Sequence, residues 1–289
     1  MNKSAESVFR NVDCEVRFDD LARQLYATDA SIYQIEPVAV AFPRSPQQAA
    51  NVIQAAIDAG IPVTPRGAGT GLAGGAVGNG LIVELARHAK WIDALDVEKQ
   101  TVRVGAGVVL DQLNEFLKPH GLCYGPDVAT SSRATLGGMI ANNSSGARAP
   151  IYGTTIDHVA AVDVVLADGT IATVGGAAET LPKHREFMAN IVRRHEELIR
   201  DKFPDILVKR WPAYALDDCL DAPGDLSKIV IGSEGTLAAV TSATLTLVRP
   251  PQKKGLGIVF FASVEEAMQA TVAFLDLKPA AIEHVDKVL

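Results

Sequence analysis

Glycines concentrate in one short segment of this 289-residue chain, directly after residues that predict a strand. The segment TPRGAGTGLAGG covers residues 64–75, and five of its twelve residues are glycine. Because glycine has no Cβ atom, the N–H groups of such a turn can come close to an anion and donate hydrogen bonds to phosphate oxygens. The turn therefore indicates a binding site for a ligand that carries phosphate.

The spacing of these glycines also fits a different nucleotide site. Gly69, Gly71 and Gly74 match the G-x-G-x-x-G fingerprint of NAD-binding Rossmann domains. That design needs a helix that opens inside the glycine run and points its N-terminus at the diphosphate. Residues 72–83 instead carry four glycines, and each costs a helix about 1 kcal/mol. The sequence thus predicts that the turn itself binds the anion, with a flexible loop without ligand as the alternative.

A second segment, residues 125–153, is rich in small and polar residues and almost lacks large apolar ones. Its side-chain donors and glycines are Asn142, Asn143, Ser144, Ser145, Gly137, Gly138 and Gly146. Such donors suit a polar ligand, for example a ribityl chain and a diphosphate. A long surface loop without a ligand is the alternative.

The residues around these segments predict an α+β fold, with short strands alternating with helices. A strand-helix-strand unit is expected over residues 38–65, where Ser45 caps the helix and Gly60 follows its end. A hairpin is expected over residues 159–174, because Asp168 and Gly169 form a strong two-residue turn signal. Further strands are expected at residues 81–85, 91–95, 101–107, 226–231 and 237–248, and further helices at residues 110–117 and 180–203.

The chain divides into three parts. Residues 1–35 are expected to be a helical lead-in appended to the main domain, with Phe18, Leu21 and Leu25 on one helical face. Residues 36–250 form the main domain. Residues 251–289 hold one expected strand at 257–262, a helix from a capping box at Ser263 and Glu266 to Leu277, and a strand-like stub at 280–285. Since so small a unit cannot close a core, we expect it to be the start of a further domain in a longer protein.

Composition excludes several classes of protein. Hydrophobic residues make up 48% and charged residues 21% of the chain, as in ordinary globular proteins. The net charge of −7 and the absence of a basic block argue against a nucleic-acid partner. The three cysteines and six histidines have no metal-ligand spacing, so no metal or iron–sulfur site is expected. No signal peptide or transmembrane segment is evident, which predicts a cytoplasmic protein, with attachment to the inner face of a membrane through a partner left open.

The order of the motifs resembles a known family. PRGAGTGLAGG is followed by PDVATSSRATLGGMIANNSSGARAPIYG, then ADGT, then IGSEGTL at residues 231–237. Over roughly residues 36–250 this resembles the PCMH-type FAD-binding domain of the vanillyl-alcohol-oxidase superfamily, and within it the D-lactate, glycolate and D-2-hydroxyglutarate dehydrogenase branch. The resemblance implies two α/β subdomains with FAD between them, followed by the start of a substrate-covering cap domain.

The resemblance also implies which residues bind the cofactor. Those that hold the diphosphate would be Pro65, Arg66, Gly67, Ala68, Gly69, Thr70, Gly71, Gly74 and Gly75. Those that wrap the rest of FAD would be Pro126, Asp127, Thr135, Gly137, Gly138, Asn143, Gly146, Tyr152 and Gly153, with Ile231, Gly232 and Glu234 closing the site. Members that attach FAD covalently have a histidine where this chain has Ala68, so non-covalent binding is expected.

The implied reaction is oxidation of a D-2-hydroxyacid (lactate, glycolate or 2-hydroxyglutarate) by hydride transfer to flavin N5, with electrons passed to a quinone, a cytochrome or an iron–sulfur acceptor. Candidates on the substrate side are Lys209, Arg210 and Tyr214, although the base and the carboxylate-binding groups are expected in the cap. Two other functions stay open: a flavin-binding electron-transfer subunit without its own turnover, and an NADPH-dependent enolpyruvyl-sugar reductase of the same superfamily.

Overall fold

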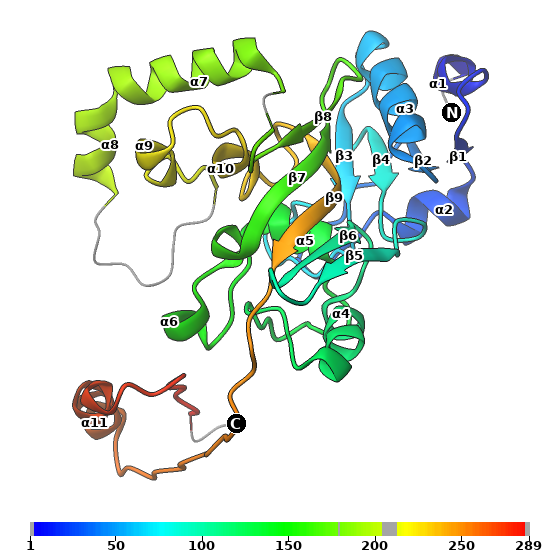
Figure 1. Cartoon of the computed structure of the whole chain (residues 1–289). Coiled ribbons are helices and arrows are strands. Elements are labelled where there is room, and N and C mark those ends of the chain that lie inside the picture. The colour runs from blue at the N-terminus through cyan, green and yellow to red at the C-terminus, as the bar shows by residue number, and fades with distance from the viewer. Residues whose placement is uncertain (1–2, 179, 204–212, 287–289) are drawn as a thin grey trace.

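Residues 15–84 contain the strands of a four-stranded sheet in the computed structural model, which describes residues 3–178, 180–203 and 213–286 (Figure 1). The strand order is β1-β2-β4-β3, in which β2, β4 and β3 are parallel and β1 is antiparallel to β2. The strands are β1 (Glu15–Arg17), β2 (Ala39–Phe42), β3 (Val63–Arg66) and β4 (Leu81–Glu84). The parallel pairing places the glycine turn at the carboxyl end of β3, where it connects to β4.

Helix α3 (Pro46–Asp58) joins β2 to β3, as the sequence predicted. The Ser45 hydroxyl accepts a hydrogen bond from Gln48 N, and Pro46 occupies the first turn, where its missing N–H costs nothing. Gly60 then adopts a φ of +69°, which favours glycine and ends the helix. The strand-helix-strand prediction is confirmed.

The N-terminal lead-in is part of this first sheet. It contains α1 (Lys3–Phe9) and α2 (Asp20–Leu25), but β1 lies between them and pairs with β2. Phe9 is buried in the core, while the side chains of Leu21 and Leu25 are 65% and 63% exposed. The prediction of one apolar helical face formed by Phe18, Leu21 and Leu25 is therefore wrong, because α2 begins only at Asp20 and buries Ala22, while Leu21 and Leu25 face outward.

A five-stranded antiparallel sheet forms the second half of the main domain, with the order β5-β6-β9-β7-β8. Its strands are β5 (Ile92–Asp96), β6 (Thr101–Gly105), β7 (Val159–Val165), β8 (Ile171–Val174) and β9 (Ala239–Thr246). The β7–β8 hairpin turns at Gly169, whose φ is +75°, as predicted. The last strand in sequence, β9, lies in the middle, so the residues before it are brought back to the centre of the domain.

Helices cover the sheets and connect them, and one hydrophobic cluster runs through residues of both. The remaining helices are α4 (Leu110–Leu117), α5 (Leu136–Asn142), α6 (Ala149–Tyr152), α7 (Pro182–Arg194), α8 (Glu196–Lys202), α9 (Asp218–Asp221), α10 (Ser227–Val230) and α11 (Val264–Phe274), with short 3-10 turns η1 (Lys118–His120), η2 (Thr155–His158) and η3 (Leu275–Leu277). The mixed α+β class is as predicted.

Three predicted elements differ from the structure. The single helix expected at 180–203 is two helices, because the chain leaves helical geometry at His195 (φ −115°, ψ 16°). The strand expected at 226–231 is absent and helix α10 lies there, since the Asp225 carboxylate accepts a hydrogen bond from Ser227 N and favours a helical turn. Residues 257–262 are not assigned to a strand, because no strand within the described residues pairs with them.

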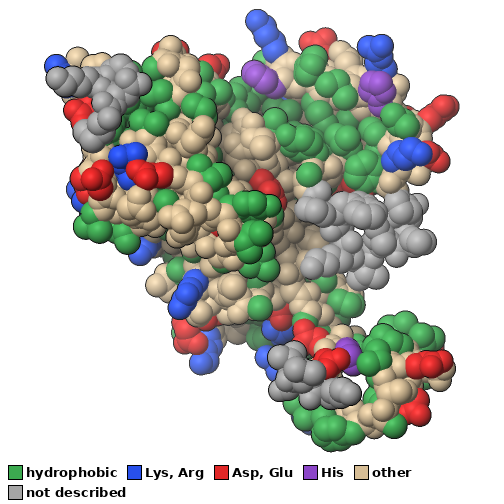
Figure 2. Space-filling view, turned by 180° about the vertical axis from the view of Figure 1, so that it is seen from behind, with side chains coloured by type: hydrophobic (Ala, Val, Ile, Leu, Met, Phe, Trp, Pro, Cys, Tyr) green, Lys and Arg blue, Asp and Glu red, His purple; other side chains and the backbone are tan. Residues whose placement is uncertain are grey.

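The C-terminal part leaves the two sheets and extends away from them (Figure 1). Helix α11 begins at Ser263, whose hydroxyl accepts from Glu266 N, so the predicted cap is confirmed. Apolar side chains lie on its surface and around it (Figure 2), the exposed ones being Leu256, Ile258, Val259, Phe260, Phe261, Val264, Met268, Val272, Leu275, Leu277, Ile282 and Val285.

The Asp163 carboxylate on β7 accepts hydrogen bonds from side chains of three other strands of the second sheet. Its carboxylate accepts hydrogen bonds from Thr173 Oγ1 (2.6 Å) and Arg103 Nη2 (2.7 Å), and a third comes from Ser242 Oγ. Burial works to raise the pKa of Asp163, but the three hydrogen bonds together outweigh burial and lower it. The ionised carboxylate therefore ties β7 to β6, β8 and β9.

Replacing Asp163 with Asn should lower the free energy of unfolding at neutral pH by about 2 kcal/mol. Because folding lowers the pKa of Asp163, this contribution is present above the ordinary carboxyl pKa of about 3.9 and is lost as the pH falls through the folded value. Urea unfolding of both proteins at neutral and acidic pH measures the difference. The exposed Asp93→Asn serves as control, and an equal loss in both variants would contradict the assigned role.

Candidate functional site

The two polar segments meet at one cavity of about 490 Å³. Its wall combines residues 65–73, 75 and 76 of the glycine turn with residues of the second segment and with Ser233, Glu234 and Gly235. Ala106, which follows β6, and Val240 of β9 complete the wall. The cavity thus lies where the carboxyl end of β3 meets the second sheet.

The glycine turn contains no helix. Residues 67–80, between β3 and β4, are turns and bends. Within the described part of the chain, none of the N–H groups of residues 67–75 donates a hydrogen bond. A run of free N–H groups along one wall of a cavity is the arrangement that binds an anion, and it lacks the helix that a Rossmann site requires. The Rossmann alternative is therefore wrong.

Two glycines show why the turn excludes side chains. A Cβ atom on Gly67 would lie 2.3 Å from Oγ1 of Thr135, in the second segment. Gly74 has a φ of +79°, and a Cβ atom there would lie 2.6 Å from the ring of Tyr33. The first glycine permits the two segments to touch, and the second permits the turn to reverse direction.

Helix α5 begins inside the second segment, which the sequence presented as a loop. Its first N–H groups are already used, because Leu136 N donates to Val108 O and Gly137 N donates to Ala106 O, both at 2.8 Å. These bonds fix the helix against the end of β6 and not against a ligand. Its other end is held by the third motif, where Gly232 N donates to Ile140 O at 3.0 Å.

Polar side chains bridge the walls of the cavity. Asn142 Nδ2 donates to Glu234 Oε1 at 3.0 Å. Glu234 has a positive φ of 52°, and a Cβ atom on Gly75 would lie 3.4 Å from its Oε2. Asn143 caps α5 in the left-handed conformation, and its side-chain oxygen accepts from Ile156 N at 2.9 Å. One hydrogen bond therefore joins the second segment to the IGSEGTL motif at the cavity, and another joins the second segment to η2.

Thr135 carries the clearest sign of a bound group. Its Oγ1 is buried and has no hydrogen-bond partner within the described residues, although the side chain lines the cavity. A buried hydroxyl without a partner costs about 1–3 kcal/mol. An oxygen-rich ligand seated beside the glycine turn would satisfy it, and a phosphate or ribityl oxygen fits this requirement.

The structure sorts the predicted cofactor-binding residues into two groups. Those that line the cavity are Pro65, Arg66, Gly67, Ala68, Gly69, Thr70, Gly71, Gly75, Thr135, Gly137, Gly138, Asn143 and Glu234. Those outside its lining are Gly74, Pro126, Asp127, Gly146, Tyr152, Gly153, Ile231 and Gly232. Asp127, for example, is paired with Arg148, its Oδ2 lying 2.5 Å from Nε. A Cβ atom on Gly146 would overlap the Asp127 carbonyl oxygen, at 1.4 Å, so Gly146 allows these two stretches to cross.

The apolar part of the cavity wall was not predicted. It includes Leu85, Ala106, Val128, Ala134, Met139, Ala238 and Val240. Val128, Ala134 and Met139 lie within the second polar segment, and Leu85, Ala106, Ala238 and Val240 lie within the predicted strands 81–85, 101–107 and 237–248. The sequence did not show that these strands and the second segment meet in space, so it did not distinguish these residues from core residues.

The substrate-side candidates are only partly placed. Lys209 and Arg210 lie outside the described residues. The Tyr214 hydroxyl lies 2.8 Å from Oγ1 of Thr236, and the side chain is 40% exposed and outside the cavity lining. Its assignment as a catalytic group stays a prediction.

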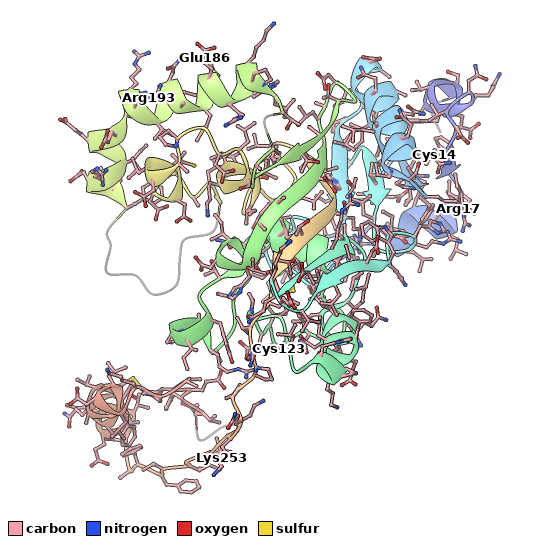
Figure 3. The ribbon with its side chains drawn as sticks, viewed as in Figure 1. Cys14, Arg17, Cys123, Glu186, Arg193 and Lys253 are labelled. Atoms are coloured by element: carbon pink, nitrogen blue, oxygen red, sulfur yellow. The ribbon has the colours of Figure 1, made fainter. Side chains whose placement is uncertain are left out.

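Metal and covalent attachment chemistry find no support around this cavity. In the described ranges no group of three His, Cys, Asp or Glu residues could hold a metal ion. Cys14 and Cys123 lie far apart in Figure 3, and all three cysteines are free. Among the described residues that line the cavity there is no His, Cys or Tyr, and Ala68 occupies the turn itself. Non-covalent attachment of the cofactor stays a prediction.

Comparison with known proteins agrees with this geometry. Residues 37–175 match a family model described as FAD binding domain. A D-2-hydroxyglutarate dehydrogenase of Escherichia coli strain K12 is 39% identical over 281 residues, covering 91% of this chain and 28% of the relative. The glycolate oxidase subunit GlcD of Bacillus subtilis strain 168 is 31% identical, covering 93% of this chain and 50% of the relative. A solved structure of alkyldihydroxyacetonephosphate synthase shares the fold, with a TM-score of 0.64 at 18% identity, over 92% of this chain and 44% of that one.

The fold and the cavity therefore define a flavin-binding protein. Residues 37–175 belong to the FAD-binding domain family, of the PCMH type, and the FAD cofactor that the resemblance implied is confirmed. The chain spans 28% to 50% of the length of the curated relatives named above. No helix among the described residues is long and apolar enough to cross a membrane.

Replacing Thr135 with Val tests the cofactor contact. The substitution keeps the shape of the side chain and removes the unpaired hydroxyl, so the stability of the FAD-free protein should be unchanged or higher. FAD affinity should fall about 10-fold, because one hydrogen bond to the cofactor is lost. Thermal melting of the FAD-free protein and fluorescence titration with FAD measure the two effects.

Thr155→Val is the matched control, since the buried Thr155 hydroxyl donates to Ser144 O at 2.7 Å. That variant should lose stability, whereas Thr135→Val should not. A Thr135→Val protein that melts earlier without FAD and binds FAD as tightly as before would contradict the assignment.

Proposed function

We propose that this chain is the FAD-binding part of an oxidoreductase that oxidises a D-2-hydroxyacid. The observation that carries the proposal is the convergence of the free N–H groups of residues 67–75 and the unpaired Thr135 hydroxyl on one cavity, in a chain whose relatives are named as hydroxyacid dehydrogenases and oxidases. When bound, FAD supplies a hydride acceptor at its flavin N5 atom.

The substrate we favour is a D-2-hydroxydicarboxylate of the 2-hydroxyglutarate type. Relatives named D-2-hydroxyglutarate dehydrogenase are 35% to 39% identical to this chain. Those named glycolate oxidase subunit or D-lactate dehydrogenase are 30% to 31% identical. Glycolate and D-lactate are the next candidates.

The residues of this chain serve to bind and orient the flavin. Free N–H groups of the glycine turn would take the diphosphate, and the apolar side chains of Leu85, Met139 and Val240 would exclude water from the ring system. Arg66 is the only cation among the described lining residues, and its guanidinium is occupied by backbone carbonyl oxygens. Groups that bind the substrate carboxylates would therefore come from elsewhere in the protein, as the cap domain prediction implies.

A flavin-binding subunit that only relays electrons is the second candidate. The lack of a free cation in the described lining, which a hydroxyacid carboxylate would require, is the observation that favours it. In either case the proposed electron acceptor is a quinone, a cytochrome or an iron–sulfur protein. No feature of the cavity favours the NADPH-dependent reductase.

Anaerobic titration of the FAD-reconstituted protein, with this chain joined to the predicted cap domain, separates these functions. We expect acid denaturation to release all flavin, because the proposed attachment is non-covalent, and D-2-hydroxyglutarate to bleach the visible flavin absorption. The L-isomer and NADPH are the controls and should leave the spectrum unchanged. If that protein binds FAD but none of D-2-hydroxyglutarate, D-lactate and glycolate bleaches it, the oxidoreductase proposal is contradicted and the relay function is supported.

A further inference from the structure

A short segment before the FAD-binding domain lies against the glycine turn. We call residues 26–33, which connect α2 towards β2, the strap. The strap precedes residues 37–175, which match the FAD-binding family model. It nevertheless touches the turn at several points: Ala30 N donates to Gly69 O at 2.9 Å, and Ala76 N donates to Asp29 Oδ2 at 3.4 Å.

Two side chains of the strap occupy the space beside Gly74 and Gly69, which have no side chains of their own. The Tyr33 ring occupies the space beside Gly74, where a Cβ atom would lie 2.6 Å from the ring. Asp29 lies beside Gly69, whose added Cβ atom would be 3.4 Å from that of Asp29. The strap therefore supports the turn on the side that carries no side chains of its own.

Arg66 joins the strap to both ends of the turn. Its Nη1 donates to Tyr26 O (3.2 Å) and to Ala76 O (2.9 Å), and its Nη2 donates to Thr28 O (2.7 Å). The guanidinium carbon lies 5.1 Å from the centre of the Tyr26 ring. Arg66 is only 8% exposed. Its planar fork is thus used by three carbonyl oxygens and an aromatic ring.

The charge of Arg66 is compensated within the protein. Burial lowers the pKa of Arg66, and the neighbouring Asp29 carboxylate works in the opposite direction. Asp29 is itself fixed, because its Oδ1 accepts from Ser31 N at 2.8 Å. A guanidinium held in this way contributes geometry to the turn and little net positive charge to the cavity.

We propose that the strap is a positioning element for the diphosphate of FAD, and that Arg66 is a positioning residue that fixes the turn and does not bind the phosphates itself. This changes the expectation, drawn from the motif, that Arg66 holds the diphosphate. The inference depends on FAD binding and is independent of the hydroxyacid proposed above.

Tyr33 provides the first test, because its side chain is 53% exposed and contributes little to folding. Tyr33→Ala should raise the Kd for FAD about 10-fold. Without the ring the glycine turn is more mobile in the FAD-free protein, so it loses more conformational entropy when FAD binds. The melting temperature of the FAD-free full chain should change by less than about 2 °C. Tyr33→Phe keeps the ring and should bind FAD normally. A Tyr33→Ala protein with unchanged FAD affinity would overturn the proposal.

Arg66 provides the second test, in Arg66→Lys and Arg66→Met. Neither side chain can reach three carbonyl oxygens in one plane, so both variants should bind FAD about 100-fold more weakly, with the same dependence of Kd on salt. If Arg66 instead bound phosphate directly, Lys would retain much of the affinity and Met would lose both affinity and salt dependence. Arg103→Lys, in the second sheet, is the control and should bind normally. If neither Arg66 variant folds, the comparison of Tyr33→Ala with Tyr33→Phe tests the proposal.

Discussion

The structure depends on a stretch of backbone whose N–H groups are kept free of partners. A protein normally pairs almost all of its backbone donors, because a buried donor without a partner costs free energy. Residues 67–75 depart from this rule within the described chain, at the wall of a cavity. The cost is bearable where the groups face solvent or an anion. Glycine at the positions that touch Thr135 and Tyr33 lets the turn stay open without a helix or a strand to satisfy it.

Sheet topology brings the second wall to this turn. Strand β9 lies between β6 and β7, so the IGSEGTL motif that precedes it ends beside α5 and the glycine turn. A Cβ atom on Gly235 would lie 3.2 Å from the Pro65 ring, which shows how closely the last motif approaches the first. Segments separated by more than 160 residues in the sequence (65 to 235) therefore form one site. The lead-in adds a third contact through the strap, so the turn is held from both sides.

Much of the fold could be predicted from local signals. The Ser45 cap, the Asp168-Gly169 hairpin and the glycine turn each encode their conformation within a few residues, and the structure has all three. Long-range pairing could not be predicted. Strand β1 gains its conformation from β2, and residues 257–262 lack a partner strand among the described residues, although their composition favours a strand. Residues 226–231 read as a strand by composition, yet the Asp225 carboxylate initiates a helical turn there.

The site was predictable in its polar half only. Free N–H groups and small residues leave a pattern in the sequence, whereas apolar wall residues such as Met139 and Val240 look like any core residue. The role of Arg66 shows a further limit, since its partners Tyr26 and Thr28 are about 40 residues away and accept its hydrogen bonds through backbone oxygens. No sequence pattern marks a carbonyl group as a partner.

Hydrogen–deuterium exchange of the full chain, with and without FAD, measures whether the N–H groups of residues 67–75 bind the diphosphate. Amides of residues 67–75 should exchange rapidly in the FAD-free protein, because they have no hydrogen-bond partner, and should become strongly protected when FAD binds. Riboflavin, which lacks the diphosphate, should leave them unprotected. Equal exchange of these amides in the free and FAD-bound protein would show that they do not bind the cofactor.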